Sequence, residues 1–275
     1  MKKIPCSVGI LTFNSESTLR RALESVREFD DIIICDGGST DRTLSIAREF
    51  GAHIIAQDPM YKKPDGSLSD YGGVRNQCLL AAKYDWFLYV DSDETISDGL
   101  REDIRRIVAE KDGPLVYKVP IGIIMDGKYL KYSSNYPGYQ YRFFNRCSGA
   151  RFIKTVHERI NFDTTKIRTG TLAHPWFIHT TRGEWSHYLA DNARYHEIEI
   201  AGACAEPFTL KGYFYYTLWW RFRASLVVIV KASRNYLLHG FRDAVPVRGE
   251  LGRAVAPLLT AWGVTACRFK KLFSK

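Results

Sequence analysis

The chain has 275 residues, of which 45% are hydrophobic and 25% charged, and its formal net charge is +9. This composition is typical of a soluble protein that buries a sizeable core. No run of about 18 apolar residues is present, and the N-terminus lacks the pattern of a signal peptide, so neither a membrane span nor a cleaved leader is expected.

Strands and helices are expected to alternate through the first third of the chain. The expected strands cover residues 8–12, 31–36, 52–56 and 86–90, and the expected helices cover 18–29, 43–50 and 74–83. The run Ile32-Ile33-Ile34 is apolar on both faces, as in a parallel sheet covered by helices. The sequence therefore predicts an α/β fold with a central, mostly parallel, Rossmann-like sheet.

The texture changes after residue 93. A helix is expected from about 97 to 108, short strands of mixed or antiparallel direction from 115 to 178, and a helix from 184 to 202. The likeliest boundary is Glu206-Pro207. We therefore expect one domain over 1–205, whose two halves divide at about residue 95, and a helical extension over 206–275.

Four short motifs lie at the carboxyl ends of predicted strands or in the loop before the fourth strand. They are Thr12-Phe13-Asn14, Asp36-Gly37-Gly38-Ser39-Thr40-Asp41, Gly73-Val74-Arg75-Asn76 and Asp91-Ser92-Asp93. In an open α/β sheet these ends converge on one crevice, where ligands bind. Two carboxylates one residue apart offer oxygen ligands to a divalent cation that holds a diphosphate.

The acidic pair has two other interpretations. Asp and Ser are common turn residues after strands. A calcium loop is also conceivable, but Ile96 stands where that loop needs glycine.

The order and spacing of these motifs resemble glycosyltransferase family 2, inverting nucleotide-sugar transferases with a Rossmann-like (GT-A) domain. The resemblance covers roughly residues 4–178. It implies that residues 1–205 form a catalytic domain, with a nucleotide half at about 1–95 and an acceptor half at about 96–205. Within this family, the sequence is most similar to the bacterial lipopolysaccharide-core glucosyltransferases, because it contains Val156-His157-Glu158 and, later, Ile178-His179 followed by Trp185.

The resemblance implies roles for matching residues of the donor site. Thr12 and Asn14 would contact the nucleotide, and Asp36 would accept a hydrogen bond from the imide of uracil. Arg75 would approach the diphosphate, unless it is a solvated helix residue. Asp91 would bind the ribose and assist the metal.

A metal and a general base complete the expected chemistry. Asp93, with Asp91, would ligate Mg²⁺ or Mn²⁺, and His179 would complete the metal shell, touch the acceptor or simply be a buried histidine. Glu158 is our candidate for the base and His157 the next, although a structural His-Glu pair on a strand is an equal alternative.

The sequence departs from many members of the family. It lacks their acidic pair followed by a Q-x-x-R-W segment, and Gln140-Tyr141-Arg142 is only a faint echo of that segment. This departure leaves the identity of the base open.

The positive charge is concentrated in the tail. From residue 208 onward twelve Lys and Arg stand against two acidic residues, and they are interleaved with Tyr, Phe and Trp. This pattern predicts a helix lying on an anionic membrane surface. A helical pair packed on the catalytic domain and a module for single-stranded nucleic acid are the alternatives, and we do not expect nucleic acid as the partner.

The six cysteines are widely spread and form no C-x-x-C pair. They predict reduced thiols in a cytosolic protein, with Cys35 and Cys78 buried.

These observations predict an enzyme that transfers a hexose from a UDP-sugar to a hydroxyl of a lipopolysaccharide-core or other lipid-linked glycan. It would work at the inner face of the bacterial cytoplasmic membrane, as a peripheral protein. A sugar nucleotidyltransferase is a weaker alternative, because no Gly-rich phosphate loop follows the first strand. A non-enzymatic basic module would explain the tail alone.

Overall fold

The structure is a computed structural model that describes residues 2–64, 66–110, 112–153, 159–181 and 188–273. Two compact units compose it: Met1–Gly122 with Pro137–His179, and Ile123–Tyr136 with Thr180–Lys275. Residues 123–136 and 180–205 thus belong to the same unit as the tail, whereas the sequence placed them in the catalytic domain. The domain boundary expected between residues 205 and 206 stays a prediction.

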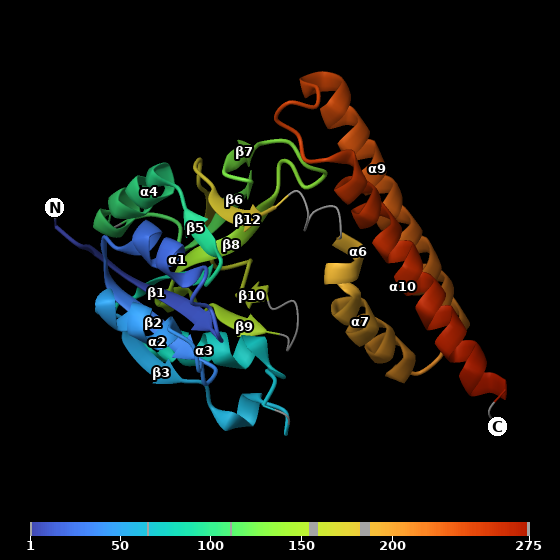
Figure 1. Cartoon of the computed structure of the whole chain (residues 1–275), viewed down its shortest axis with the longest axis horizontal. Coiled ribbons are helices and arrows are strands. Elements are labelled where there is room, and N and C mark those ends of the chain that lie inside the picture. Colours follow the sequence, from blue (N-terminus) through green and yellow to red (C-terminus); the bar gives the residue numbers. More distant parts are fainter. Residues whose placement is uncertain (1, 65, 111, 154–158, 182–187, 274–275) are drawn as a thin grey trace. The chain divides into compact units, whose positions relative to one another are not determined.

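The first unit begins with four parallel strands in the order β3-β2-β1-β4 (Figure 1). They are β1 (Ile4–Thr12), β2 (Phe29–Asp36), β3 (His53–Ala56) and β4 (Trp86–Asp91). Between them lie α1 (Leu19–Val26), α2 (Thr43–Glu49), the short η1 (Pro59–Tyr61) and α3 (Tyr71–Ala81). The α/β fold with a Rossmann-like parallel half is confirmed.

The remaining strands of the sheet are mostly antiparallel. The sheet continues from β4 through β8 (Tyr139–Asn145), β6 (Val116–Met125), β12 (Trp176–Thr180) and β5 (Glu94–Ile96). The strands β7 (Lys128–Leu130) and β11 (Thr169–Thr171) also pair with β6, and β9 (Arg151–Ile153) pairs with β10 (Arg159–Asn161). The other helical elements of this unit are α4 (Asp98–Ala109) and η2 (Arg146–Ser148).

The central strands β1, β2 and β4 are buried on both faces. Successive residues of a strand point to opposite sides, so neighbouring residues enter different apolar clusters. In β2, Ile32 and Ile34 join one apolar cluster, with α1 and α4, while Ile33 and Cys35 join another, with α3. Cys35 is a buried free thiol, as expected, and so is Cys78.

Helix α3 begins earlier than the sequence suggested. The Asp70 side chain caps it by accepting a hydrogen bond from the Gly73 amide at 2.9 Å. Arg75 lies inside this helix, as the sequence also indicated, but three residues further from its start. The helix expected over 18–29 ends instead at Val26, because Phe29 already starts β2.

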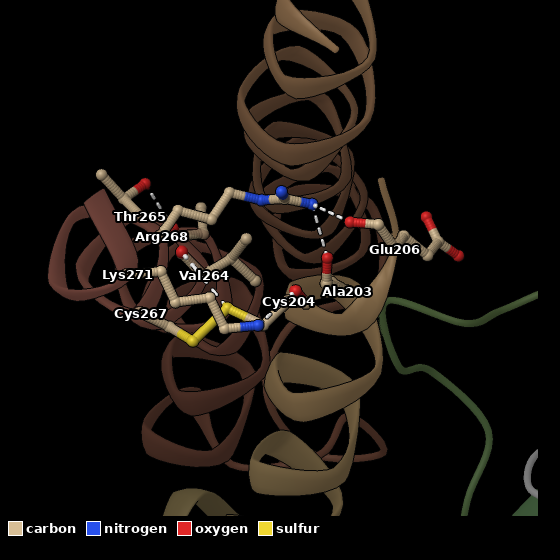
Figure 2. The surroundings of a disulfide bond; sticks show 9 residues. Ala203, Cys204, Glu206, Val264, Thr265, Cys267, Arg268 and Lys271 are labelled. Carbon is tan, nitrogen blue, oxygen red and sulfur yellow. Dashed lines mark hydrogen bonds between the residues drawn. A yellow bond between two sulfur atoms is a disulfide. The ribbon is translucent and has the colours of Figure 1, made fainter. Parts of the chain in front are cut away.

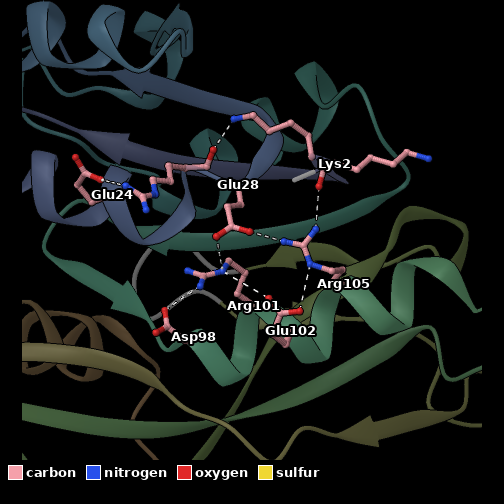
Figure 3. Close-up of polar contacts among 9 residues, drawn as sticks. Lys2, Glu24, Glu28, Asp98, Arg101, Glu102 and Arg105 are labelled. Atoms are coloured by element: carbon pink, nitrogen blue, oxygen red, sulfur yellow. Dashed lines mark hydrogen bonds and ion pairs between the residues drawn. The ribbon is translucent and has the colours of Figure 1, made fainter.

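A network of ion pairs closes the amino end of β1 (Figure 3). The carboxylate of Glu28 forms ion pairs with Arg101, at 3.2 Å between Nε and Oε1, and with Arg105. The guanidinium of Arg105 also donates to the carbonyl of Lys2 at 2.9 Å. Because β1 starts at Ile4, this network lies at the end of the strand opposite Thr12. It joins α4 to the residues around α1 at a distance from the candidate site.

The second unit is mainly helical, which confirms the expected C-terminal helices. It comprises α6 (Tyr188–Asp191), α7 (Ala193–Ala205), α8 (Leu210–Gly212), the π-helical η3 (Tyr213–Trp219), α9 (Trp220–His239) and α10 (Val247–Phe273). Helices α9 and α10 run side by side (Figure 1). Within the described residues no helix combines the length and apolarity needed to cross a membrane.

A disulfide between Cys204 and Cys267 joins α7 to α10 (Figure 2). The expectation that all six cysteines are reduced is therefore wrong for this pair. The two residues are 63 positions apart, and only the packing of the helices brings their Cα atoms to 6.6 Å. Nearby, Lys271 donates to the carbonyl of Cys204 at 2.9 Å and Arg268 to that of Ala203 at 2.6 Å, which satisfies carbonyls at the end of α7.

The disulfide predicts the number of reactive thiols. Alkylation of the protein in denaturant without reductant should modify Cys6, Cys35, Cys78 and Cys147, and prior reduction should add Cys204 and Cys267. Intact-mass measurement counts the adducts. Six adducts without reductant would show that the bridge is absent from the isolated protein.

Candidate active site at the carboxyl ends of the parallel strands

The carboxylate of Asp36 organises the loop after β2. It accepts hydrogen bonds from the Thr12 hydroxyl at 2.9 Å, the Gly38 amide at 2.8 Å, the Ser39 amide at 2.8 Å and the Ser39 hydroxyl at 2.5 Å. Desolvation raises the pKa of Asp36, but the hydrogen bonds from Ser39, Thr12 and Gly38 outweigh it and hold the pKa below its usual value. Gly38 adopts φ of 99°, which favours glycine.

Thr12 and Asp36, which were both expected to contact the nucleotide, are therefore close together. In this structure, however, they are hydrogen-bonded to each other. A carboxylate offers about four acceptor positions, and here internal donors occupy them. Asp36 is also 5% exposed. A uracil imide would have to replace one of these donors, most simply the Ser39 hydroxyl. The role of Asp36 in reading the base stays a prediction.

Asn14 links the loops after β1 and β2. Its side-chain oxygen accepts a hydrogen bond from the backbone amide of Thr40 at 2.9 Å, and its backbone amide donates to the Ser39 hydroxyl at 2.9 Å. The residue adopts φ of 48°, a left-handed conformation that Asn tolerates better than most residues. Its exposed position leaves it accessible to a ligand.

Arg75 lies beneath the acidic turn and is not the solvated helix residue of the alternative interpretation. It is 5% exposed and donates from Nη2 to Asp91 Oδ1 at 2.7 Å. Its guanidinium lies 4.7 Å from the centre of the Tyr89 ring. Desolvation raises the pKa of Asp91, but the charges of Arg75 and Arg142 outweigh it and keep the carboxylate ionised.

Asp93 is exposed, and its carboxylate forms no ion pair within the described part of the chain. Partial desolvation of the carboxyl group and the charge of Asp91 raise the pKa of Asp93. A divalent cation would relieve this repulsion, and Mg²⁺ is usually held by one or two carboxylates together with phosphates. The donor set thus fits a cation bound by Asp91, Asp93 and a diphosphate.

His179 lies on β12, which pairs with β5. Its Nε2 is 2.8 Å from the Thr95 hydroxyl, and desolvation together with the charge of Arg21 lowers the pKa of His179 to about 4. The ring is therefore neutral at pH 7. Among the described residues no three His, Cys, Asp or Glu side chains are grouped as metal ligands. The expected place of His179 in the metal shell stays a prediction.

The predicted general base, Glu158, and the adjacent His157 lie outside the described residues. Their role stays a prediction.

Two buried charged residues were missed by the sequence analysis. Arg142 on β8 forms a two-point ion pair with Glu94 on β5, with Nη2 2.9 Å from Oε1 and Nη1 in contact with Oε2. Burial raises the pKa of Glu94, and Arg142 opposes that rise. An arginine next to Phe143-Phe144 in an apolar strand was the available signal, because a buried cation requires an acidic partner.

Comparison with known proteins identifies the family. Residues 7–171 match the sequence model described as Glycosyl transferase family 2, which spans more than half of the chain. The chain belongs to this family. The predicted resemblance is confirmed, and with it the enzyme class, a glycosyltransferase.

Several relatives are themselves named as glycosyltransferases. An uncharacterized glycosyltransferase of Rickettsia felis is 26% identical over 276 residues, covering 88% of this chain and 83% of the relative. One from Rickettsia typhi is 33% identical over 130 residues, 46% of this chain and 41% of the relative. The lipopolysaccharide core biosynthesis glycosyltransferase LpsC of Rhizobium meliloti is 30% identical over 120 residues, 42% of each protein. The chain thus spans less than half of the latter two.

Among solved structures, the chain is similar to S. aureus TarS 1–349 in complex with UDP. The TM-score is 0.47 and the identity 15%, with 100% of this chain and 92% of that chain covered.

The neutral state of the half-buried His179 predicts a pH-dependent stability. Between the folded pKa of about 4 and the ordinary value near 6.5 the unfolded state binds more protons, so stability falls as pH drops through this window. In urea unfolding, the wild type should lose about 1 kcal/mol more between pH 7.5 and 5 than His179→Gln, allowing for partial exposure. Equal losses would contradict a lowered pKa of His179 in the folded protein.

Proposed function

We propose that the protein is a metal-assisted, inverting glycosyltransferase that moves a hexose from a UDP-sugar to a hydroxyl of a lipid-linked glycan. One observation carries this proposal: the Asp36 network, Asp91 and Asp93 lie at or just after the carboxyl ends of strands in one parallel sheet, and Arg75 on α3 contacts Asp91 there. This is the edge at which open α/β sheets bind ligands.

Each part of this edge suits one part of the donor. The exposed Asn14 and the loop fixed by Asp36 offer polar groups to a nucleoside. Arg75 supplies a permanent positive charge beside Asp91, and Asp91 with Asp93 would hold the divalent cation. When bound, such a cation neutralises the charge that grows on the leaving diphosphate. Mg²⁺ and Mn²⁺ both suit this oxygen donor set.

The transfer also requires a base on the acceptor side. It would take the proton of the acceptor hydroxyl as that oxygen attacks the anomeric carbon from the face opposite UDP, which inverts the configuration. Glu158 remains our candidate for this role and His157 the alternative.

A lipopolysaccharide-core acceptor is supported by one relative, LpsC of Rhizobium meliloti, whose name states that role. The match covers 42% of this chain. The family itself admits other acceptors, so the acceptor is proposed as a lipid-linked glycan of which the lipopolysaccharide core is one example.

The helices of the second unit support contact with a membrane. The buried side of α9 carries the small or polar residues Ser225, Ala232 and Asn235, whereas its exposed side carries large apolar ones. On η3 and α9 these exposed residues are Phe214, Tyr215, Tyr216, Trp219, Trp220, Phe222, Leu226, Val227, Ile229, Val230, Leu237 and Leu238. This is the reverse of a helix that packs a hydrophobic stripe into a protein core.

Helix α10 has the same inverted pattern. It buries Glu250, Ala254, Ala256, Thr260, Ala261 and Val264, which are small or polar apart from Val264, and exposes Leu251, Val255, Leu258, Leu259 and Trp262. Exposed cations lie among the apolar residues of α9, at Arg223 and Arg234. Apolar side chains with interspersed cations suit an anionic lipid surface. We therefore propose that residues 208–275 hold the protein on the inner face of the cytoplasmic membrane.

The donor site is tested by Asp93→Asn. Because the variant loses a charged ligand at an exposed position, it should fold normally but lose the increase in UDP affinity that Mn²⁺ gives the wild type, as measured by isothermal titration calorimetry. Asp30→Asn is a matched control, since Asp30 lies at the amino end of β2, opposite Asp36. Unchanged enhancement by Mn²⁺ in Asp93→Asn would remove Asp93 from the metal site.

The membrane contact is tested by flotation with phosphatidylglycerol vesicles. The wild type should float with anionic vesicles and less with neutral ones. The double variant Leu226→Gln, Ile229→Gln should stay unbound, because both side chains are 47% exposed and their replacement removes apolar contact without opening the fold. Failure of the wild type to float would refute this contact and leave the donor site unaffected.

A further inference from the structure

A buried ion pair lies directly behind the acidic turn. The side chains of Glu94 and Arg142 are 8% and 5% exposed, and they meet through two contacts. Arg142 also donates from Nε to Gln140 Oε1 at 3.0 Å, and its guanidinium lies 3.4 Å from the centre of the Trp176 ring. The arginine is thereby fixed by a strand neighbour, a carboxylate and an aromatic face.

The same carboxylate holds the backbone of the acidic turn. The amide of Asp91 donates to Glu94 Oε2 at 3.0 Å, so Glu94 spans from the first residue of the turn to Arg142. Asp91 ends β4, Glu94 begins β5, and Arg142 lies on β8 beside β4. One charged group therefore connects the turn over residues 91–94 to the neighbouring antiparallel strand.

The second guanidinium of the site belongs to the same arrangement. Arg75 lies 4.7 Å and Arg142 4.6 Å from the centre of the Tyr89 ring. Arg75 binds the side chain of Asp91, and Arg142 acts on its backbone through Glu94. Both the carboxylate and the peptide of Asp91 are thus fixed by buried charge.

Stability alone is a poor reason for such a pair. Removing two charges from water costs about as much as their attraction returns, and apolar residues of similar volume often replace a buried ion pair at no cost in stability. Retaining Glu94 and Arg142 therefore calls for a benefit that apolar residues cannot give. A directed hydrogen bond to the Asp91 amide is such a benefit.

We propose that Glu94 and Arg142 are positioning residues that fix the Asp91-Ser92-Asp93 turn in the geometry required to bind a divalent cation and a nucleoside diphosphate. They touch neither ligand; they act through the backbone of Asp91. This inference rests on the proposed function, because it assumes that the turn binds the donor.

The test separates stability from positioning. The double variant Glu94→Leu, Arg142→Met removes both charges together and keeps the volume nearly constant, so its thermal midpoint should stay near that of the wild type. Its UDP affinity in Mn²⁺ should fall by about tenfold, as when outer-shell partners of a metal ligand are removed. UDP affinity without metal should change little.

A matched control replaces an ion pair at the opposite end of the sheet. Glu28→Leu, Arg105→Met removes a pair in the network of Figure 3 and should leave UDP affinity in Mn²⁺ unchanged. If the Glu94, Arg142 double variant does not fold, the variant Arg142→Lys tests the proposal in its place. Lysine keeps the positive charge but cannot make both contacts with Glu94. This variant should stay folded and bind UDP in Mn²⁺ more weakly than the wild type.

The outcomes are distinct. A folded double variant, or a folded Arg142→Lys if the double variant does not fold, that binds UDP in Mn²⁺ as tightly as the wild type would overturn the positioning role and leave the proposed function intact. A wild type that binds no UDP in Mn²⁺ would overturn the proposed function and this inference with it.

Discussion

The ion pair between Arg75 and Asp91 is the interaction on which the candidate site depends. It joins α3 to the end of β4 at 2.7 Å, in an environment where an unpaired charge would be costly. Arg75 neutralises Asp91. The nearby carboxylate of Asp93 therefore does not face a second carboxylate that lacks a cationic partner. Within the described residues the site therefore presents the exposed carboxylate of Asp93 beside a buried cation, an arrangement that suits a divalent ion and a diphosphate together.

The loops after β1 and β2 are organised before any ligand binds. Asp36 gathers donors from Thr12, Gly38 and Ser39, and Asn14 bridges to Thr40. A loop fixed in this way loses less conformational entropy when a nucleoside binds. Because these donors occupy all acceptor positions of the Asp36 carboxylate, Asp36 can accept a hydrogen bond from a base only by releasing one of them.

The second unit follows a different physical rule. Helices α9 and α10 bury small and polar residues and expose large apolar ones, so their packing depends on close approach of the backbones rather than on a hydrophobic core. Asn235 illustrates this: it is 1% exposed and donates to the carbonyl of Ser133 at 2.8 Å. Apolar surface left outside in this way is stable where a lipid surface can cover it.

Local pattern was enough to predict the parallel half and the donor motifs. Strands buried on both faces show a continuous apolar run, and the motifs that contain Thr12, Asp36 and Asp91 meet because the carboxyl ends of parallel strands share one edge. The individual roles expected of these residues came from the resemblance to the family. Tertiary structure alone decided the pairs of Glu94 with Arg142, His179 with Thr95 and Cys204 with Cys267. Each joins residues 48 to 84 positions apart. Such contacts depend on antiparallel register and helix packing, which short-range sequence patterns do not encode.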